Sequence, residues 1–363
     1  MAMKKRALLP ILLLAACGTA RAQWQIQNSG TTADLRGIDN VGGGVAWASG
    51  TNGTVLRTED GGYLWQACAM PPGAKHLDFR GIQAFDANTA IVMSSGKGDL
   101  SRLYKTTDGC QSWKLVFTNP DKDGFWDAVQ MEPPDPDQHY AIILGDPVDG
   151  SLVIEWSNDS GDTWHRVDHP TALPREEAFA ASNSALFVDW QDGFFLFGTG
   201  GPRGARVFTN WPSYEIWHRH SVRVFGSGSS KGIFSIASKS LAQPYNATAV
   251  GGDFRKPEES SATAAWSADG GEHWAAASTP PHGFRSAVAY DAASKTWITV
   301  GPNGTDISTD DGKNWHAVHP DAALHEAPDA DRNWNALSLP FVVGPHGRIG
   351  KLDPNALALE KSK

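Results

Sequence analysis

The chain has 363 residues, a net charge of −9, 38 glycines and 15 tryptophans. An acidic chain without a run of basic residues does not suit nucleic acid, so we expect no such partner. The sequence has no phosphate-binding loop, no dinucleotide-binding motif and no zinc-ligand spacing, so we expect no cofactor and no metal site.

Residues 1–22 are typical of an export signal. Lys4, Lys5 and Arg6 precede an apolar run, residues 7–16, that is too short to span a bilayer. The signal can end in two ways: at a signal-peptidase site, residues 20–22, or at a lipoprotein site in which Cys17 carries a lipid. Both place the mature protein in the periplasm or outside the cell, and the second would tether it to the membrane.

The mature chain is expected to begin with a strand, Trp24 to Gln27, that has no partner beside it in the sequence. After it, an apolar-polar-small-apolar phrase opens an inner strand seven times. The phrases are residues 35–38, 79–82, 126–129, 178–181, 233–236, 284–287 and 334–337. A small third residue suits a strand that is crowded by its neighbours near a central axis.

A second motif, Ser/Thr-x-Asp-x-Gly-x-x-Trp or one change from it, recurs downstream of the inner strands. Its copies are spaced by about 40 to 50 residues, apart from one double interval that contains a decayed copy near Thr209 to Trp217. The aspartates of the five clear copies are Asp60, Asp108, Asp159, Asp269 and Asp310. An Asp that accepts backbone hydrogen bonds and a Gly that allows positive φ make a tight turn, and the Trp packs between sheets. We identify the motif as the Asp-box and assign these aspartates a structural role.

This period predicts an all-β fold, a seven-bladed β-propeller formed by residues 23–354, followed by a polar tail, residues 355–363. The seventh unit, which begins at Trp334, has no Asp-box and no outer strand. The strand Trp24 to Gln27 can supply the missing strand, which closes the ring and removes two open sheet edges. We expect a monomer.

Cys68 and Cys110 are the cysteines of the predicted propeller. Cys110 replaces a glycine of the second Asp-box, and Cys68 lies three residues after Trp65 in the preceding blade. In an exported protein, two cysteines at the periphery of adjacent blades indicate a disulfide, and two buried thiols are the alternative.

The polar position of each inner-strand phrase is expected to line the central channel. From blade six round to blade five, these positions are Arg285, Asn335, Arg36, Arg80, Asp127, Phe179 and Phe234. Three guanidinium groups on one face favour a carboxylate, a phosphate or an acidic peptide as ligand. The alternative is that each arginine pairs with a nearby acid, such as Asp34, Asp78 or Asp127.

The Asp-boxes, the phrases Leu-Arg-Gly-Ile and Phe-Arg-Gly-Ile at residues 35–38 and 79–82, and the seven units resemble the photosystem II stability/assembly factor-like propellers. These form a branch of the BNR-repeat proteins, within the sialidase-like superfamily. The resemblance covers nearly all of the mature chain. It implies an exported, non-catalytic scaffold, an assembly or stability factor for an envelope complex, that holds a partner polypeptide with an arginine patch. Here the patch would be Arg36, Arg80 and Arg285.

A sialidase-like exo-glycosidase acting on an acidic sugar is the alternative function, because sialidases also carry Asp-boxes. Such an enzyme needs three arginines, here Arg36, Arg80 and Arg285, and a Tyr nucleophile with a Glu, for which Tyr290 is the candidate. Sialidases have six blades, however, and no Glu is clearly placed beside Tyr290, so we expect no catalysis. Other acids at residues 132–137 and 145–150 are interpreted as loops and turns of the third blade.

Overall fold

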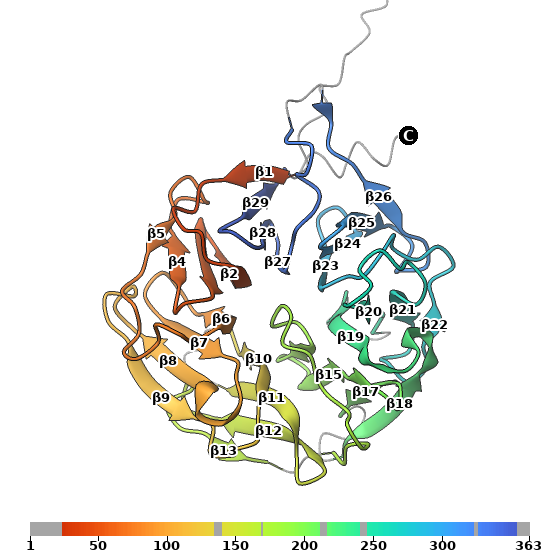
Figure 1. The fold of residues 1–363 in the computed structure, drawn as a ribbon, viewed down its shortest axis with the longest axis horizontal. Helices are drawn as coiled ribbons and strands as arrows, with labels where there is room; N and C mark the ends of the chain where they lie inside the picture. The colour runs from red at the N-terminus through yellow and green to blue at the C-terminus, as the bar shows by residue number, and fades with distance from the viewer. Residues whose placement is uncertain are drawn as a thin grey trace, which may run out of the picture.

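The computed structural model describes residues 24–133, 140–167, 170–210, 216–239, 245–322 and 326–353. In this part of the chain, seven antiparallel sheets are arranged as blades around a central axis (Figure 1). The predicted seven-bladed, all-β propeller is therefore confirmed. Three predicted segments lie outside the described residues: the export signal with Cys17, the polar tail and part of the decayed motif near Pro212. None of the described helices has the length and hydrophobicity needed to cross a membrane.

The first three blades follow the predicted order of strands. Blade one contains β2 (Leu35–Gly42), β3 (Val45–Gly50), β4 (Val55–Thr58) and β5 (Gln66–Ala67). Blade two contains β6 (Phe79–Ala84), β7 (Ala90–Ser94), β8 (Arg102–Thr106) and β9 (Lys114–Thr118), with the short 3₁₀ helix η1 (Gly98–Leu100). Blade three contains β10 (Trp126–Met131), β11 (Ala141–Val148), β12 (Ser151–Ser157) and β13 (His165–Arg166).

The remaining blades complete the ring. Blade four contains β14 (Leu186–Asp189), β15 (Phe194–Gly198), β17 (Ala205–Thr209) and β18 (His218–Val222), followed by η2 (Arg223–Phe225). Blade five contains β19 (Gly228–Ser238), β20 (Ala247–Asp253), β21 (Ala264–Ser267), β22 (Ala275–Ala276) and an added edge strand, β16 (Gly200–Gly201). Blade six contains β23 (Ala287–Asp291), β24 (Thr296–Gly301), β25 (Gly304–Ser308) and β26 (His316–Val318). Blade seven contains β27 (Ala336–Ser338), β28 (Phe341–Val343), β29 (Ile349–Leu352) and β1 (Trp24–Gln27).

The ring is closed by β1, the first described strand, as the sequence predicts. It pairs antiparallel with β29, from Trp24 opposite Leu352 to Gln27 opposite Ile349 (Figure 1). The Trp24 side chain is buried, and its indole nitrogen donates a hydrogen bond of 3.1 Å to the Thr305 hydroxyl of blade six. β1 therefore completes blade seven and also fastens it to blade six.

The five motif aspartates each bond within their own turn. Every one accepts a bond from the hydroxyl two residues before it, as in Thr58 to Asp60 at 2.8 Å. Every one also accepts a bond from the backbone N–H four residues later, at 2.9 to 3.0 Å. The hydroxyl in turn accepts the N–H of the motif's fifth residue, a Gly or Cys110 with positive φ. All of these bonds lie inside one turn, which is what a structural role requires.

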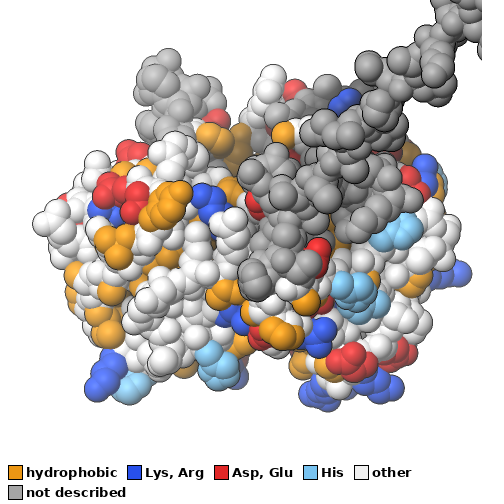
Figure 2. Space-filling view, turned by 90° about the horizontal axis from the view of Figure 1, so that it is seen from above, with side chains coloured by type: hydrophobic (Ala, Val, Ile, Leu, Met, Phe, Trp, Pro, Cys, Tyr) orange, Lys and Arg blue, Asp and Glu red, His pale blue; other side chains and the backbone are white. Residues whose placement is uncertain are grey.

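The apolar core is divided among the gaps between neighbouring blades. Trp65, which ends the first motif, is 5 % exposed and packs edge-on against Phe341 of blade seven, with ring centroids 5.6 Å apart. Viewed from the edge that carries β1, the molecule is flattened, and hydrophobic, acidic and basic side chains are interspersed over the described part of that side (Figure 2). No patch of one side-chain type stands out over the described part of this side.

A disulfide between Cys68 and Cys110 joins blades one and two, with the two Cα atoms 5.3 Å apart. Cys110 has a φ of 64°, in the region where the other four motifs have glycine. Beside the bridge, the Ala69 N–H donates to the Cys110 carbonyl at 3.1 Å. The bridge thus links the end of one blade to the outer turn of the next.

Reduction of this disulfide is expected to lower the free energy of unfolding by about 2 to 4 kcal/mol, because the bond restricts the unfolded chain. The linked residues are 42 apart in sequence. Thermal unfolding with and without reductant measures the loss, and a Cys68→Ser/Cys110→Ser variant should show the same loss without responding to reductant. A non-reducing digest with both cysteines free to alkylation would contradict the bridge.

Candidate functional site

The centre of the ring is crossed by residues 178–184, of which the sequence predicts 178–181 to open an inner strand. That prediction is wrong: the inner strand of blade four is β14, which begins only at Leu186. In Figure 1 the yellow-green chain before β14 forms a loop that reaches toward the middle of the ring. We call residues 178–184 the central segment.

The central segment is held by side chains that bond to other blades. Asn183 is buried, and its amide oxygen accepts the Val129 N–H at 2.8 Å while its amide nitrogen donates to the Val129 carbonyl at 3.0 Å. Ser182 donates to the Ser286 carbonyl of blade six at 2.8 Å, and Ser184 shares a bond with Ser235 of blade five. These hydroxyl and amide groups replace the ladder bonds of a strand, so the segment stays ordered without being part of a sheet.

Gly81 shows why a small residue is needed in the inner strand of blade two. A Cβ at this position would lie 2.9 Å from the Asn183 amide oxygen and 2.9 Å from a methyl group of Val129. The glycine therefore permits the close approach of the central segment.

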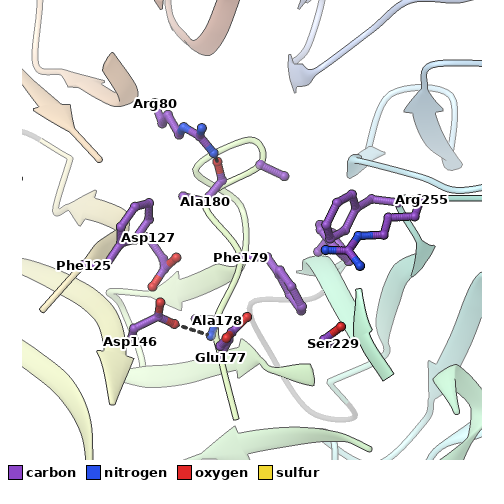
Figure 3. A pocket seen from close by; sticks show the side chains of 13 residues that line it. Arg80, Phe125, Asp127, Asp146, Glu177, Ala178, Phe179, Ala180, Ser229 and Arg255 are labelled. Atoms are coloured by element: carbon purple, nitrogen blue, oxygen red, sulfur yellow. Dashed lines mark hydrogen bonds between the residues drawn. The ribbon is translucent and has the colours of Figure 1, made fainter. Parts of the chain in front are cut away.

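Arg36 and Arg80 share one acid. Asp78 lies between them, with its two oxygens 3.2 Å from Arg36 Nε and 2.8 Å from Arg80 Nε. Arg80 also donates to the Ala180 carbonyl of the central segment at 3.0 Å (Figure 3). Both guanidinium side chains remain 28 % exposed. The two alternatives from the sequence therefore combine: the arginines form one cluster, and one carboxylate pairs with both.

Arg285 does not belong to this cluster, and the prediction that it lines the channel is wrong. Its side chain is completely buried within blade six, where Nε donates to Asp306 at 2.8 Å and Nη1 donates to Asn303 at 2.6 Å. A second nitrogen, Nη2, also bonds Asp306. His282 bonds the other oxygen of Asp306, so the guanidinium is enclosed by its own blade.

Asn335 and Tyr290 lie apart from the arginine pair. Asn335 donates its amide to the Leu35 carbonyl at 2.8 Å, which links blade seven to blade one. Tyr290 is the second-last residue of β23 and packs on Trp297, with ring centroids 5.0 Å apart. Arg36 and Arg80, in contrast, lie at the beginning of their inner strands. The arrangement of three arginines around a tyrosine that a sialidase needs is not formed.

A pocket of about 470 Å³ lies beside Arg80 and the central segment (Figure 3). One part of its wall is acidic, with Asp127, Asp146 and Glu177, and another part is aromatic, with Phe179 stacked on Phe234 at 3.9 Å between ring centroids. The sequence predicts Asp127, Phe179 and Phe234 around the channel but Asp146 in a turn. Asp146 instead lies in β11, where the pairing with β12 is irregular, and its carboxylate accepts the Ala178 N–H at 3.0 Å.

The pocket raises the pKa of two of its acids. Burial, followed by the nearby charge of Asp146, holds the pKa of Asp127 well above its ordinary value although Arg80 acts in the opposite direction. Burial raises the pKa of Asp146 to about 7, against a smaller opposing effect of the Ala178 hydrogen bond. Carboxyl groups perturbed in this way inside a pocket are typical of functional sites.

No family model and no curated protein sequence matches this chain. Among solved structures, "YCF48 bound to D1 peptide" aligns with a TM-score of 0.62 and 18% identity, covering 91% of this chain and 96% of that one. The fold is similar to that of YCF48. YCF48 from Cyanidioschyzon merolae aligns with a TM-score of 0.61 and 18% identity, covering 92% and 100% of the two chains.

The likeness to YCF48 confirms the predicted resemblance to photosystem II stability-factor-like propellers for the fold. A propeller of another kind, the WD40 domain of Doa1, also aligns, with a TM-score of 0.57, 9% identity and coverage of 93% and 99%. Because such a ring serves many functions, the function of this chain has to be argued from its own site residues.

Proposed function

We propose that this chain is an exported, non-catalytic propeller scaffold that binds an acidic segment of a protein partner at the channel face that carries Arg36 and Arg80. The observation that supports this most is the sharing of Asp78 by two guanidinium groups. One carboxylate balances only one of the two charges, and a guanidinium has five N–H donors. The pair therefore keeps a net positive charge and unused donors for an incoming carboxylate.

YCF48, the structurally similar propeller, has been seen with a D1 peptide, which supports a polypeptide as ligand. Export by the signal at residues 1–22, with or without a lipid on Cys17, would place the scaffold in the cell envelope, where an assembly factor for an envelope complex would act. The exo-glycosidase alternative is not proposed, because Arg285 is enclosed in blade six and Tyr290 lies away from Arg36 and Arg80.

Binding of an acidic peptide is expected to weaken as salt rises, and to weaken by about five- to tenfold in Arg36→Ala or Arg80→Ala, because both changes remove an exposed charge from the site. The probe is a short fluorescent peptide rich in Asp and Glu with a free C-terminal carboxylate, titrated by anisotropy at several salt concentrations.

Arg219→Ala is the matched control for this titration. Arg219 is exposed on β18, the outer strand of blade four, so its removal changes the net charge equally but should leave binding unchanged. The proposal is refuted if the affinity for the acidic peptide does not change with salt concentration. It is also refuted if the Arg36→Ala/Arg80→Ala variant keeps the wild-type affinity. If the purified protein hydrolyses a sialoside, the scaffold proposal is wrong and the chain is an exo-glycosidase.

A further inference from the structure

The acidic wall of the pocket has no counterpart in the proposed function, which uses only the arginine pair. Asp127 is the centre of this wall: it is 1 % exposed, and its Oδ2 atom has no hydrogen-bond partner among the described residues. Figure 3 shows its carboxylate directed into the pocket toward that of Asp146. A buried carboxylate oxygen without a partner is costly, and such a group in a native fold calls for an explanation, for which a ligand is one.

Two further carboxylates face the same space. Asp146 is half-buried and has one backbone donor, the Ala178 N–H, while Glu177 is exposed at the mouth. Among the described residues, none of Asp127, Asp146 and Glu177 forms a salt bridge. The charge of Arg80 acts on Asp127 and lowers its pKa, but Arg80 forms its ion pair with Asp78 and not with one of these three acids.

The two arginines of the pocket do not fill this role. Arg80 directs its Nε to Asp78 and its Nη1 to the Ala180 carbonyl. Arg255 lies over the ring of Phe254, 5.7 Å from its centroid, on the other side of Phe179 in Figure 3. Neither arginine therefore forms an ion pair with an acid of this lobe, and the lobe carries its full negative charge only above the raised pKa values of Asp127 and Asp146.

The opposite wall suits the hydrocarbon part of a ligand. Phe179 stacks on Phe234, and Phe234 meets Phe254 and Phe284 edge-on at 6.0 and 4.7 Å between centroids. Aromatic faces next to carboxylates attract organic cations, both through the ring quadrupole and through contact with methylene groups.

A metal ion fits the pocket less well than an organic cation does. Metal ligands must bring their donor atoms close together, and the one group of described residues that does so within 4.8 Å is the exposed set Asp269, Glu272 and His273, in an outer turn. The pocket acids are spread along a longer wall.

We propose that the lobe formed by Asp127, Asp146, Glu177 and Phe179 is a binding site for an alkylammonium group, either a lysine side chain of a protein partner or a free diamine. The ammonium would lie between Asp127 and Asp146, and its methylene chain would lie along Phe179 and Phe234. This inference goes beyond the proposed function and does not rest on it.

The affinity of this site is expected to increase with pH. The ammonium binds the ionised acids, and the pKa of Asp146 is about 7, so the site loses charge as the pH falls through that value. Asp127, with its raised pKa, acts in the same direction. The other charged groups that face the pocket are Arg80, Arg255 and Glu177. Binding should therefore be several-fold tighter at pH 8 than at pH 6.

The test is calorimetric titration of the full chain at pH 8 and low salt with two probes: cadaverine, and a glycine-flanked peptide that contains one lysine. Asp127→Asn and Asp146→Asn should each weaken binding by about tenfold, because each removes a charge that the ammonium contacts directly. The control Asp123→Asn removes an exposed acid, whose ion-pair partners are Lys97 and Lys122, and should leave the binding affinity unchanged.

Each outcome decides the proposal. Binding of the lysine peptide alone identifies a partner's side chain as the ligand, and binding of cadaverine alone identifies a free amine. Failure of both probes, or equal affinity in wild type, Asp127→Asn and Asp146→Asn, overturns the site. We expect Asp127→Asn to have a higher melting temperature than the wild type, and this measurement also checks that the variant is folded. Asp146→Asn tests the same site independently. The probes for this lobe are cationic, whereas the probe for the arginine pair is an acidic peptide. If the acidic peptide fails to bind, the result for the cationic probes is therefore unaffected.

Discussion

Deletion of residues 24–29 is expected to abolish cooperative unfolding of a monomer and to cause aggregation. The deletion removes β1, which leaves the edge of β29 without its backbone partner from Ile349 to Leu352. The unpaired backbone groups of an open sheet edge can form hydrogen bonds with other chains, which leads to aggregation. Light scattering and a thermal melt measure the effect, and a deleted protein that remains monomeric with an unchanged melting temperature would contradict closure by β1.

A single change in the same strand should show that burial matters as well as pairing. Trp24→Ala is expected to cost about 3 to 5 kcal/mol of stability, because the ring is buried beside Trp334 and its nitrogen bonds Thr305. Ile26→Ala, two residues along β1, is the matched control, since Ile26 is 44 % exposed and its truncation should cost little.

Arg285→Ala is expected to destabilise the protein by about 3 to 5 kcal/mol, because it leaves the buried carboxylate of Asp306 without its guanidinium. Both side chains are almost completely buried, so solvent does not screen the pair. Burial raises the pKa of Asp306, but the bonds from His282 and Arg285 more than offset this and hold the pKa below its ordinary value. A lowered pKa means that this stabilisation is present at neutral pH and is lost as the pH falls below about 4.

The measurement is urea unfolding of Arg285→Ala, with Arg36→Ala as control. Arg36 is partly exposed, and its loss should change stability by less than about 1 kcal/mol. If Arg36→Ala were the more destabilising of the two, the assignment of Arg285 to the core of blade six and of Arg36 to the binding face would have to be reversed.

The fold could be predicted from the sequence because each blade repeats the same local chemistry. The Asp-to-hydroxyl turn and the packed Trp recur with little change, and a strand at Trp24 without a partner matches a seventh unit without an outer strand. The prediction fails at the central segment, since Ala178 to Ala181 has the composition of an inner-strand phrase, and at Asp146, which lies in β11 and not in a turn. The run Ser182, Asn183 and Ser184 before Leu186 was the signal of a segment that bonds through its side chains.

The site was harder to predict because the same residue type has different surroundings in equivalent positions. The same position of the phrase is occupied by Arg36, Arg80 and Arg285. Arg285 differs because Asp306, on the third strand of the same blade, bonds its guanidinium and encloses it. The acidic lobe combines Asp127 of blade three, the irregular part of β11 and the central segment, and no sequence period brings these together.

Cross-linking can locate the place on the propeller where an acidic peptide binds. A peptide rich in Asp and Glu that carries a photo-reactive residue is bound to the full chain, irradiated, and the linked protein residues are identified by mass spectrometry. We expect links to residues 35–37, 78–81 and 178–184, which disappear in Arg36→Ala/Arg80→Ala and persist in Arg219→Ala. Links confined to the outer turns of the blades, or links that persist in Arg36→Ala/Arg80→Ala, would contradict binding at Arg36 and Arg80.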